Sequence, residues 1–166
     1  PMVEGLHIVD YDDFQCNTLT ELFQEADREI IEFTGAFVGL VTRYCLISFD
    51  FNDFRSFLEY QTKNKNIDFL TLTGRVNFLR RELLKDWYKR LSAKYSSVDD
   101  VAIIVFAIEY AEWLNDSEEA TELMNVIHNF MQPFSADTVI KFSIYRDETI
   151  PSHQYRINIF TKCKKQ

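Results

Sequence analysis

The sequence predicts an α+β domain in which one mixed or antiparallel sheet is covered by several helices and the chain ends in a β-hairpin. Segments with apolar residues at helical spacing alternate with segments rich in β-branched and aromatic residues. Hydrophobic residues make up 46% of the chain, with 15 Phe and 8 Tyr, and 166 residues suit one ordinary domain. We therefore expect a single domain over residues 2–166, with Pro1 as the remnant of an expression tag, because translation begins at methionine.

The first third of the chain is predicted to run strand, helix, strand. Residues 6–9 predict a short strand, and Asp12 or Asp13 can cap the following helix, because a carboxylate accepts the unpaired N–H groups of a first turn. Gly35 is expected to end that helix. Residues 37–51 are rich in β-branched and aromatic side chains and predict a long strand. The apolar positions of the helix are Leu19, Leu22, Phe23, Ala26, Ile30 and Phe33.

The next segments predict a shorter helix followed by a loop. Residues 54–61 predict a helix capped by Asn52 or Asp53, and residues 62–66 a polar loop. Residues 67–73 are interpreted as a strand or as the approach to the next helix.

An acidic segment at residues 10–14 is echoed at residues 50–54. Each segment leaves a predicted strand and enters a predicted helix. Helix capping is the simpler interpretation, because Asp and Asn side chains accept first-turn N–H groups. A shared acidic site and two related strand–helix units are the alternatives.

Residues 75–95 give the strongest helix prediction. The apolar stripe of this helix consists of Val76, Leu79, Leu83, Leu84, Trp87 and Leu91. Ser97 with Asp100 resembles a capping pair for a buried helix over residues 98–114, where alanines favour a helix in an otherwise strand-like run.

The C-terminal third predicts one more helix and a hairpin. A helix capped by Asp116 or Ser117 is expected to reach about Met131. Residues 138–145 and 154–160 alternate apolar and polar side chains on either side of a turn, which is typical of a two-stranded hairpin.

Cysteine usage and hydropathy indicate a reducing, cytoplasmic compartment. Cys16, Cys45 and Cys163 are odd in number and lack the spacing of a disulfide framework or a zinc site. We expect no signal peptide and no membrane span, because the longest apolar run, residues 101–108, is far shorter than the roughly 20 residues that cross a bilayer.

Charge is distributed very unevenly along the chain. Residues 1–33 carry a net charge of −8 and residues 34–74 a net charge of zero. Residues 75–95 carry +5, residues 96–140 carry −9 without a single Lys or Arg, and residues 141–166 carry +4. These values sum to the chain total of −8.

The long segment without Lys or Arg predicts a surface with a concentrated negative field. Such a field steers association with a protein that has a basic surface, so we expect an acidic binding face. Its predicted residues are Asp99, Asp100, Glu109, Glu112, Asp116, Glu118, Glu119 and Glu122. The alternative is that these side chains form ordinary solvated helix faces or pair with the basic helix.

The basic helix supports a second interpretation, binding of nucleic acid. Arg81, Lys85 and Lys89 follow an i, i+4, i+8 ridge that could contact phosphates. The overall charge argues against this, because a protein with a sequence pI near 4.9 repels a polyanion over most of its surface.

Common catalytic and metal-binding patterns are missing from the sequence. Only four glycines occur, and neither of the glycine-rich phosphate-binding motifs is present. His7, His128 and His153 fall in different predicted elements without metal-ligand spacing, and no serine lies in a nucleophile elbow. We therefore expect no enzyme, no cofactor and no metal, with a small enzyme assembled from scattered residues as the alternative.

No stretch carries a motif specific enough to indicate a family. The leading hypothesis is a small acidic inhibitor or immunity-type protein, of viral or phage origin, that counteracts a host defence or nucleic-acid enzyme by covering a basic site. It depends on the size, the acidic segments and the missing catalytic patterns.

Overall fold

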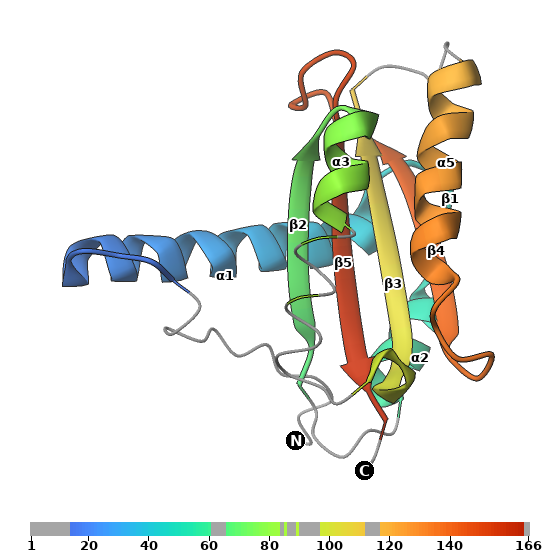
Figure 1. The fold of residues 1–166 in the computed structure, drawn as a ribbon, viewed down its shortest axis with the longest axis horizontal. Helices are drawn as coiled ribbons and strands as arrows, with labels where there is room; N and C mark the ends of the chain where they lie inside the picture. The colour runs from blue at the N-terminus through green and yellow to red at the C-terminus, as the bar shows by residue number, and fades with distance from the viewer. Residues whose placement is uncertain are drawn as a thin grey trace.

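The protein is a five-stranded mixed sheet between two layers of helices (Figure 1). The structure, a computed structural model, describes residues 14–60, 66–83, 85, 89, 97–111 and 117–164. The strands are β1 (Cys45–Ile47), β2 (Asp68–Gly74), β3 (Val101–Tyr110), β4 (Val139–Arg146) and β5 (Tyr155–Cys163). Their order in the sheet is β1-β4-β3-β5-β2, with β3 and β4 parallel and the other neighbours antiparallel. The predicted fold class, an α+β domain with helices covering one mixed sheet, is confirmed.

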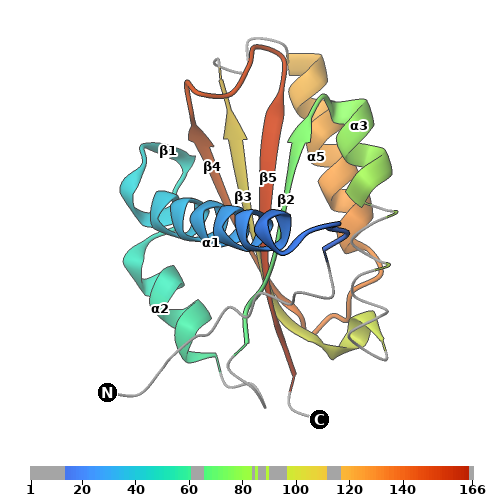
Figure 2. The same cartoon turned by 90° about the vertical axis from the view of Figure 1, so that its left-hand side faces the viewer.

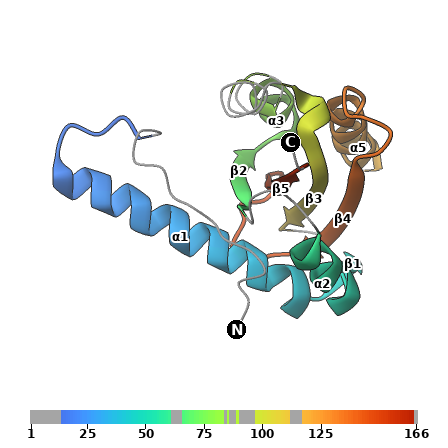
Figure 3. The ribbon, with the colours of Figure 1, turned by 90° about the horizontal axis from the view of Figure 1, so that it is seen from below.

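Helices cover both faces of the sheet (Figures 2 and 3). They are α1 (Leu19–Thr42), α2 (Phe51–Glu59), α3 (Val76–Glu82) and α5 (Ser117–Met131), and a short 3₁₀ helix, η3 (Val98–Asp100), precedes β3. One face carries α1 and α2, and the other carries α3 and α5 (Figure 3). The first half of α1 projects past the edge strand β2, as Figures 1 and 3 both show.

The central strand β3 faces a different core on each side, because alternate side chains of a strand point to opposite faces. Ile104, Phe106, Ile108 and Tyr110 lie in the core formed with α3 and α5. Ile103, Val105 and Ala107 lie in the core formed with α1 and α2. Glu109 is the next odd-numbered residue of β3, so its carboxylate points toward the layer that contains α1.

The predicted helix over residues 98–114 is wrong, because this segment forms η3 and β3. Every residue of β3 is buried. A strand that is buried on both faces reads as a continuous apolar run, and such a run cannot be distinguished from a buried helix by periodicity. The predicted capping pair is present: Ser97 and Asp100 form a capping box, but it starts the short η3.

The prediction of one long strand over residues 37–51 is wrong in length: α1 continues to Thr42, and only the short strand β1, Cys45–Ile47, lies in this segment. Gly35 does not end the helix: it lies within α1 without a positive φ angle. Ala36, Gly39 and Leu40 continue the buried face of α1. Packing against the sheet therefore outweighs the preference of the β-branched residues for a strand.

The last two strands lie where they were predicted, but they do not form a hairpin with each other. Strand β3 lies between β4 and β5 and is hydrogen-bonded to both. The strand alternative for residues 67–73 is confirmed by β2, Asp68–Gly74, and the helix expected from residue 117 is α5.

The helix caps are partly as predicted. The N-cap of α2 is Asp50 and not the predicted Asn52 or Asp53, so the helix begins at Phe51; Asp53 completes a capping box from inside the helix. The capping interpretation of residues 50–54 is therefore confirmed. Thr18 caps α1.

Several predictions fall on residues outside the described part of the chain. They concern the strand at residues 6–9, the caps Asp12 and Asp13, most of the loop at residues 62–66, and most of the predicted helix after Leu83. Among the helices that the structure describes, none has the length and apolarity needed to span a membrane.

Candidate functional site

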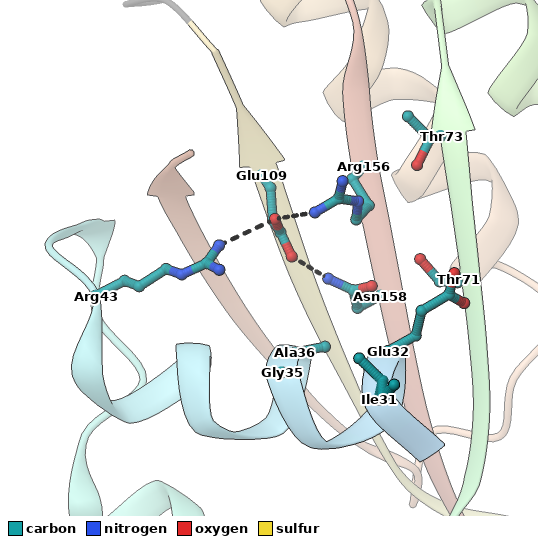
Figure 4. Close-up of a pocket in the computed structure, with 10 residues that line it drawn as sticks. All are labelled: Ile31, Glu32, Gly35, Ala36, Arg43, Thr71, Thr73, Glu109, Arg156 and Asn158. Carbon is teal, nitrogen blue, oxygen red and sulfur yellow. Dashed lines mark hydrogen bonds and ion pairs between the residues drawn. The ribbon is translucent and has the colours of Figure 1, made fainter. Parts of the chain in front are cut away.

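A buried carboxylate, Glu109, is the centre of a polar network on the α1 side of the sheet (Figure 4). Its side chain is 2% exposed. The register of the sheet places Tyr145 of β4 and Arg156 of β5 directly beside it, one on each neighbouring strand. Asn158 lies two residues further along β5, on the same face of that strand. The pairing of the strands therefore assembles this network.

Four side chains donate hydrogen bonds to the Glu109 carboxylate. Oε1 accepts from the Tyr145 hydroxyl at 2.8 Å and from the Asn158 side-chain amide. Oε2 accepts from Nη1 of Arg43 at 3.1 Å and from Nη1 of Arg156 at 3.0 Å. Arg43 immediately follows α1, so its ion pair ties the end of that helix to the central strand. The buried charge is both paired and hydrogen-bonded, as burial of a carboxylate requires.

A second buried carboxylate, Asp147, balances the two guanidinium groups. It accepts from Arg43 at 2.6 Å and lies 3.5 Å from Nη1 of Arg156. The backbone N–H of Asp147 donates to the carbonyl oxygen of Tyr110, which holds the end of β4 against the end of β3. Two cations thus face two anions, and the network has no net formal charge.

The pKa values of the two carboxylates shift in opposite directions. Burial raises the pKa of Glu109, and the hydrogen bond from Tyr145 opposes this shift without cancelling it. Burial also acts to raise the pKa of Asp147, but the hydrogen bonds from the side chain and backbone of Thr149 outweigh it and hold that pKa well below its usual range. Burial and the neighbouring Glu109 carboxylate raise the pKa of Tyr145, so its hydroxyl stays a hydrogen-bond donor.

A cavity of about 290 Å³ opens over this network, between α1 and the sheet (Figure 4). It is lined by Ile31, Glu32, Gly35, Ala36, Arg43, Thr71, Thr73, Glu109, Arg156 and Asn158. Figure 4 shows Arg43 on one side of the cavity and the two threonines of β2 on the other. The carboxylate of Glu109 and the amide of Asn158 lie between them.

The residues predicted for an acidic binding face lie in separate elements of the structure. Asp99 and Asp100 lie in η3, before β3, whereas Glu118, Glu119 and Glu122 belong to α5, which begins beyond the other end of that strand. The ten residues of β3 span about 33 Å, at about 3.3 Å per residue. Glu122 forms an ion pair with Arg80 at 2.7 Å, as the alternative of pairing with the basic helix anticipates.

Glu109 was predicted for that face, and this prediction is wrong because its carboxylate is enclosed by Arg43, Arg156, Tyr145 and Asn158. Glu112 and Asp116 lie outside the described residues. Recognition of a basic partner by the remaining residues stays a prediction.

The predicted nucleic-acid-binding ridge begins in α3, which contains Arg81, and continues beyond the end of that helix. Arg81, Lys85 and Lys89 are exposed, and the Arg81 guanidinium lies 6.0 Å from the centre of the Phe78 ring. His128 is exposed on α5, His153 lies in the segment between β4 and β5, and His7 lies outside the described residues. Within the part of the chain that the structure describes, no group of three His, Cys, Asp or Glu side chains is placed to hold a metal ion.

Sequence reasoning missed most of the network. Arg43, Tyr145, Asp147, Arg156 and Asn158 were not singled out, because only the strand register brings them together. One signal was available: Glu109 interrupts a run of apolar residues, and a charged residue inside a buried strand requires partners. Arg156 and Asn158, spaced by two on a predicted strand, could have supplied them.

No family model matches the chain, and no curated protein matches it. Solved structures do share its fold. One, described as an empty FtsZ dimer from M. jannaschii, superposes with a TM-score of 0.64 at 15% identity, over 91% of this chain and 41% of that chain. Another, a tryptophan-to-tyrosine mutant of M. jannaschii FtsZ, gives a TM-score of 0.70 at 17% identity, over 96% of this chain and 47% of that chain.

These matches correct the functional hypothesis drawn from the sequence. The expectation of an inhibitor or immunity-type protein of viral or phage origin is wrong, because the solved structures that share this fold are structures of FtsZ. Acidic composition is a weak guide to function, since it reports on surface charge and not on fold. The chain spans less than half the length of the FtsZ structures that it matches. Its fold is similar to the fold of the part of each FtsZ chain on which it superposes.

Proposed function

We propose that this chain is a self-assembling module of an FtsZ-like cytoskeletal protein, and that α1 carries the contact surface. Its fold is shared with FtsZ, and one of the matched structures is described as an FtsZ dimer. The observation that carries the proposal is an exposed apolar stripe along α1.

The stripe consists of large apolar side chains that are 40% to 73% exposed. They are Leu19, Phe23, Ile30, Ile31, Val38 and Val41. At about 100° of rotation per residue, all six fall within one sector of about 120° around the helix axis. The buried residues Ala26, Ala36 and Leu40 lie in the neighbouring sector, which faces the sheet. Helix α1 therefore has a second apolar surface besides its core face.

An apolar stripe of this length is unusual on a solvated helix. A helix of 24 residues is about 36 Å long, so the stripe runs along most of the long dimension of a small domain. Contiguous exposed apolar surface of this kind marks contact surfaces, because burying it releases ordered water. Thr20, Asp27 and Thr34 interrupt the sector and are exposed, as expected of a contact surface that also tolerates water.

The occupant that we propose is a second copy of this chain. The description of one matched structure as a dimer supports this choice. The other candidate is the remainder of a longer FtsZ-like chain, since more than half of each matched chain has no counterpart here. In that case the isolated chain would stay monomeric.

Sedimentation velocity over a concentration series tests the proposal. We expect the wild-type chain to associate as its concentration rises. Ile30→Glu and Val38→Glu should each weaken association by at least about tenfold, because a carboxylate buried in an apolar contact loses its hydration. Asn125→Glu adds the same charge at an exposed position of α5, on the other face of the sheet, and should associate like the wild type. A wild-type chain that is monomeric at every concentration contradicts the proposal.

We further propose that the module works in the cytoplasm. Cys16, Cys45 and Cys163 are free thiols in the structure. Free cysteines are typical of proteins from reducing compartments.

A further inference from the structure

The cavity over Glu109 is surrounded by hydrogen-bonding groups that have no partner among the described residues. Arg43 and Arg156 each use only Nη1 for their ion pairs, so Nε–H and the second amino group of each remain unpaired in the described part of the chain. Their side chains are 37% and 33% exposed and line the cavity. A guanidinium offers five N–H donors, so both arginines can bind a further oxygen group.

Acceptors lie on the opposite side of the same cavity. The carboxylate of Glu32 makes no hydrogen bond or ion pair with another described residue, although it lines the cavity. Thr71 and Thr73 contribute hydroxyl groups, likewise without a side-chain partner in the described chain. Figure 4 shows Glu32 close to Thr71 and the arginine side chains nearer to Glu109. Donors therefore dominate one part of the cavity and acceptors the other.

The charges of the lining groups favour a ligand that has both signs. Glu109 and Asp147 already neutralise the two arginines, so the site does not carry the excess positive charge that a strongly anionic ligand requires. Glu32 is the remaining charge, and it favours a cationic group at the acceptor side. A carboxylate at the arginines and an ammonium at Glu32 satisfy both sides together.

The cavity size limits the ligand to a small molecule. A volume of about 290 Å³ is at the lower end of the range of ligand pockets, about 300–1,000 Å³. An amino acid of small or medium size fits this space.

We propose that this cavity binds a small zwitterion of the amino-acid class, with its carboxylate on the free N–H groups of Arg43 and Arg156 and its ammonium on Glu32. The threonine hydroxyls complete the ammonium side. The buried Glu109 holds the two guanidinium groups in place and does not contact the ligand's ammonium.

Gly35 offers a variant that blocks the cavity without disturbing the fold. A Cβ atom built at Gly35 meets no heavy atom within 4 Å, and the residue lies inside α1 and lines the cavity. Gly35→Leu therefore places a side chain in open space and increases helix propensity. Glu32→Gln removes only the proposed ammonium partner, and Asp27→Asn removes one charge from an exposed position of the same helix outside the cavity.

Ligand-observed saturation-transfer NMR tests the proposal, with L-alanine, L-threonine and β-alanine as zwitterionic probes and acetate and methylammonium as single-charge probes. We expect at least one zwitterion to bind the wild type and the single-charge probes to bind far more weakly. Glu32→Gln should weaken zwitterion binding by about tenfold, Gly35→Leu should abolish it, and Asp27→Asn should leave it unchanged.

Three results would overturn the proposal. The first is that no zwitterion binds the wild type at concentrations up to about 10 mM. A specific site should have a dissociation constant below this concentration. The second is equal binding to Gly35→Leu, which would place the probe elsewhere. The third is that acetate binds as well as the zwitterions and that Glu32→Gln has no effect. Thermal unfolding of each variant shows that it is folded under the conditions of the titration.

Discussion

Glu109 on β3 and Arg156 on β5 stand directly opposite each other in an antiparallel pair of strands and are joined by an ion pair of 3.0 Å. Arg43, from the end of α1, reaches the same carboxylate oxygen from the other side. This shared oxygen connects the long helix to the centre of the sheet. It adds to the apolar packing of Ala36 and Leu40 that holds α1 on the sheet.

Glu109→Gln should destabilise the fold, because it leaves two guanidinium groups with one carboxylate. Removing one partner of a buried ion pair costs about 3–5 kcal/mol, and we expect about 2–3 kcal/mol here since the arginines are one-third exposed. Urea unfolding measures the change. Glu148→Gln is the control, because Glu148 is 79% exposed in its ion pair with Arg146. A loss below about 1 kcal/mol for Glu109→Gln would mean that the network is not a structural support.

Asp147 should make stability depend on pH in the acidic range. Its folded-state pKa lies below the unfolded value, so its contribution is fully present above about pH 4 and is lost as the pH falls toward the folded-state pKa. Asp147→Asn removes this contribution. The urea midpoint of the variant should therefore fall less between about pH 4 and about pH 2, a range that lies below the unfolded pKa, than that of the wild type. Identical pH dependence of the two proteins, with Asp137→Asn as the exposed control, would contradict the assignment.

Substitution by alanine should affect stability differently at two glycines of α1. Gly35→Ala meets open space and should stabilise the protein by about 0.5–1 kcal/mol through higher helix propensity. At Gly39 a Cβ would lie 3.3 Å from the Tyr145 hydroxyl, which is buried and bound to Glu109. Gly39→Ala should therefore lose the propensity gain or destabilise the fold. Thermal unfolding of the two variants measures the change in stability. An equal gain at both positions would show that Tyr145 can move freely.

Lys162 should be needed for the end of α2. Its side chain is 1% exposed, and its Nζ donates to the carbonyl oxygens of Phe57, Leu58 and Tyr60 at 3.3, 2.8 and 3.1 Å. Lys162→Met keeps the apolar stem but leaves these carbonyls without the charged donor, at a cost of about 2–3 kcal/mol. Hydrogen exchange should quicken first in α2. Lys85→Met, at an exposed position, is the control, and unchanged protection of α2 in Lys162→Met would refute the capping role.

The fold class could be predicted from the sequence. The secondary structure was predicted wrongly where the local preference of the residues and their burial disagree. Residues 50–54 carry a local capping signal, so the start of a helix there could be recognised within a few residues. In β3 the run Val-Ala-Ile-Ile-Val-Phe is buried on both faces, so it has no alternating pattern to identify it as a strand. Residues 37–42 are helical because Leu40 packs into the core with Phe57, a contact that local sequence does not reveal.

The candidate site was harder to predict than the fold. In the sequence Glu109 is one of many acidic residues, and its burial depends on the layer that α1 forms over β3. Its partners come from β4, β5 and the end of α1, and a shift of one residue in either strand pairing would turn them to the other face. Long-range register, and not local composition, creates the site.

The most direct test of self-assembly through α1 is photo-cross-linking from the stripe. A photoreactive amino acid at position 30 should yield a cross-linked dimer, and mass spectrometry should place both cross-linked peptides in or beside α1 of the two copies. The same group at position 125, exposed on α5, should yield little dimer. Cross-links confined to single chains at position 30, or equal dimer yields from both positions, would contradict the proposal that α1 joins two copies of the protein.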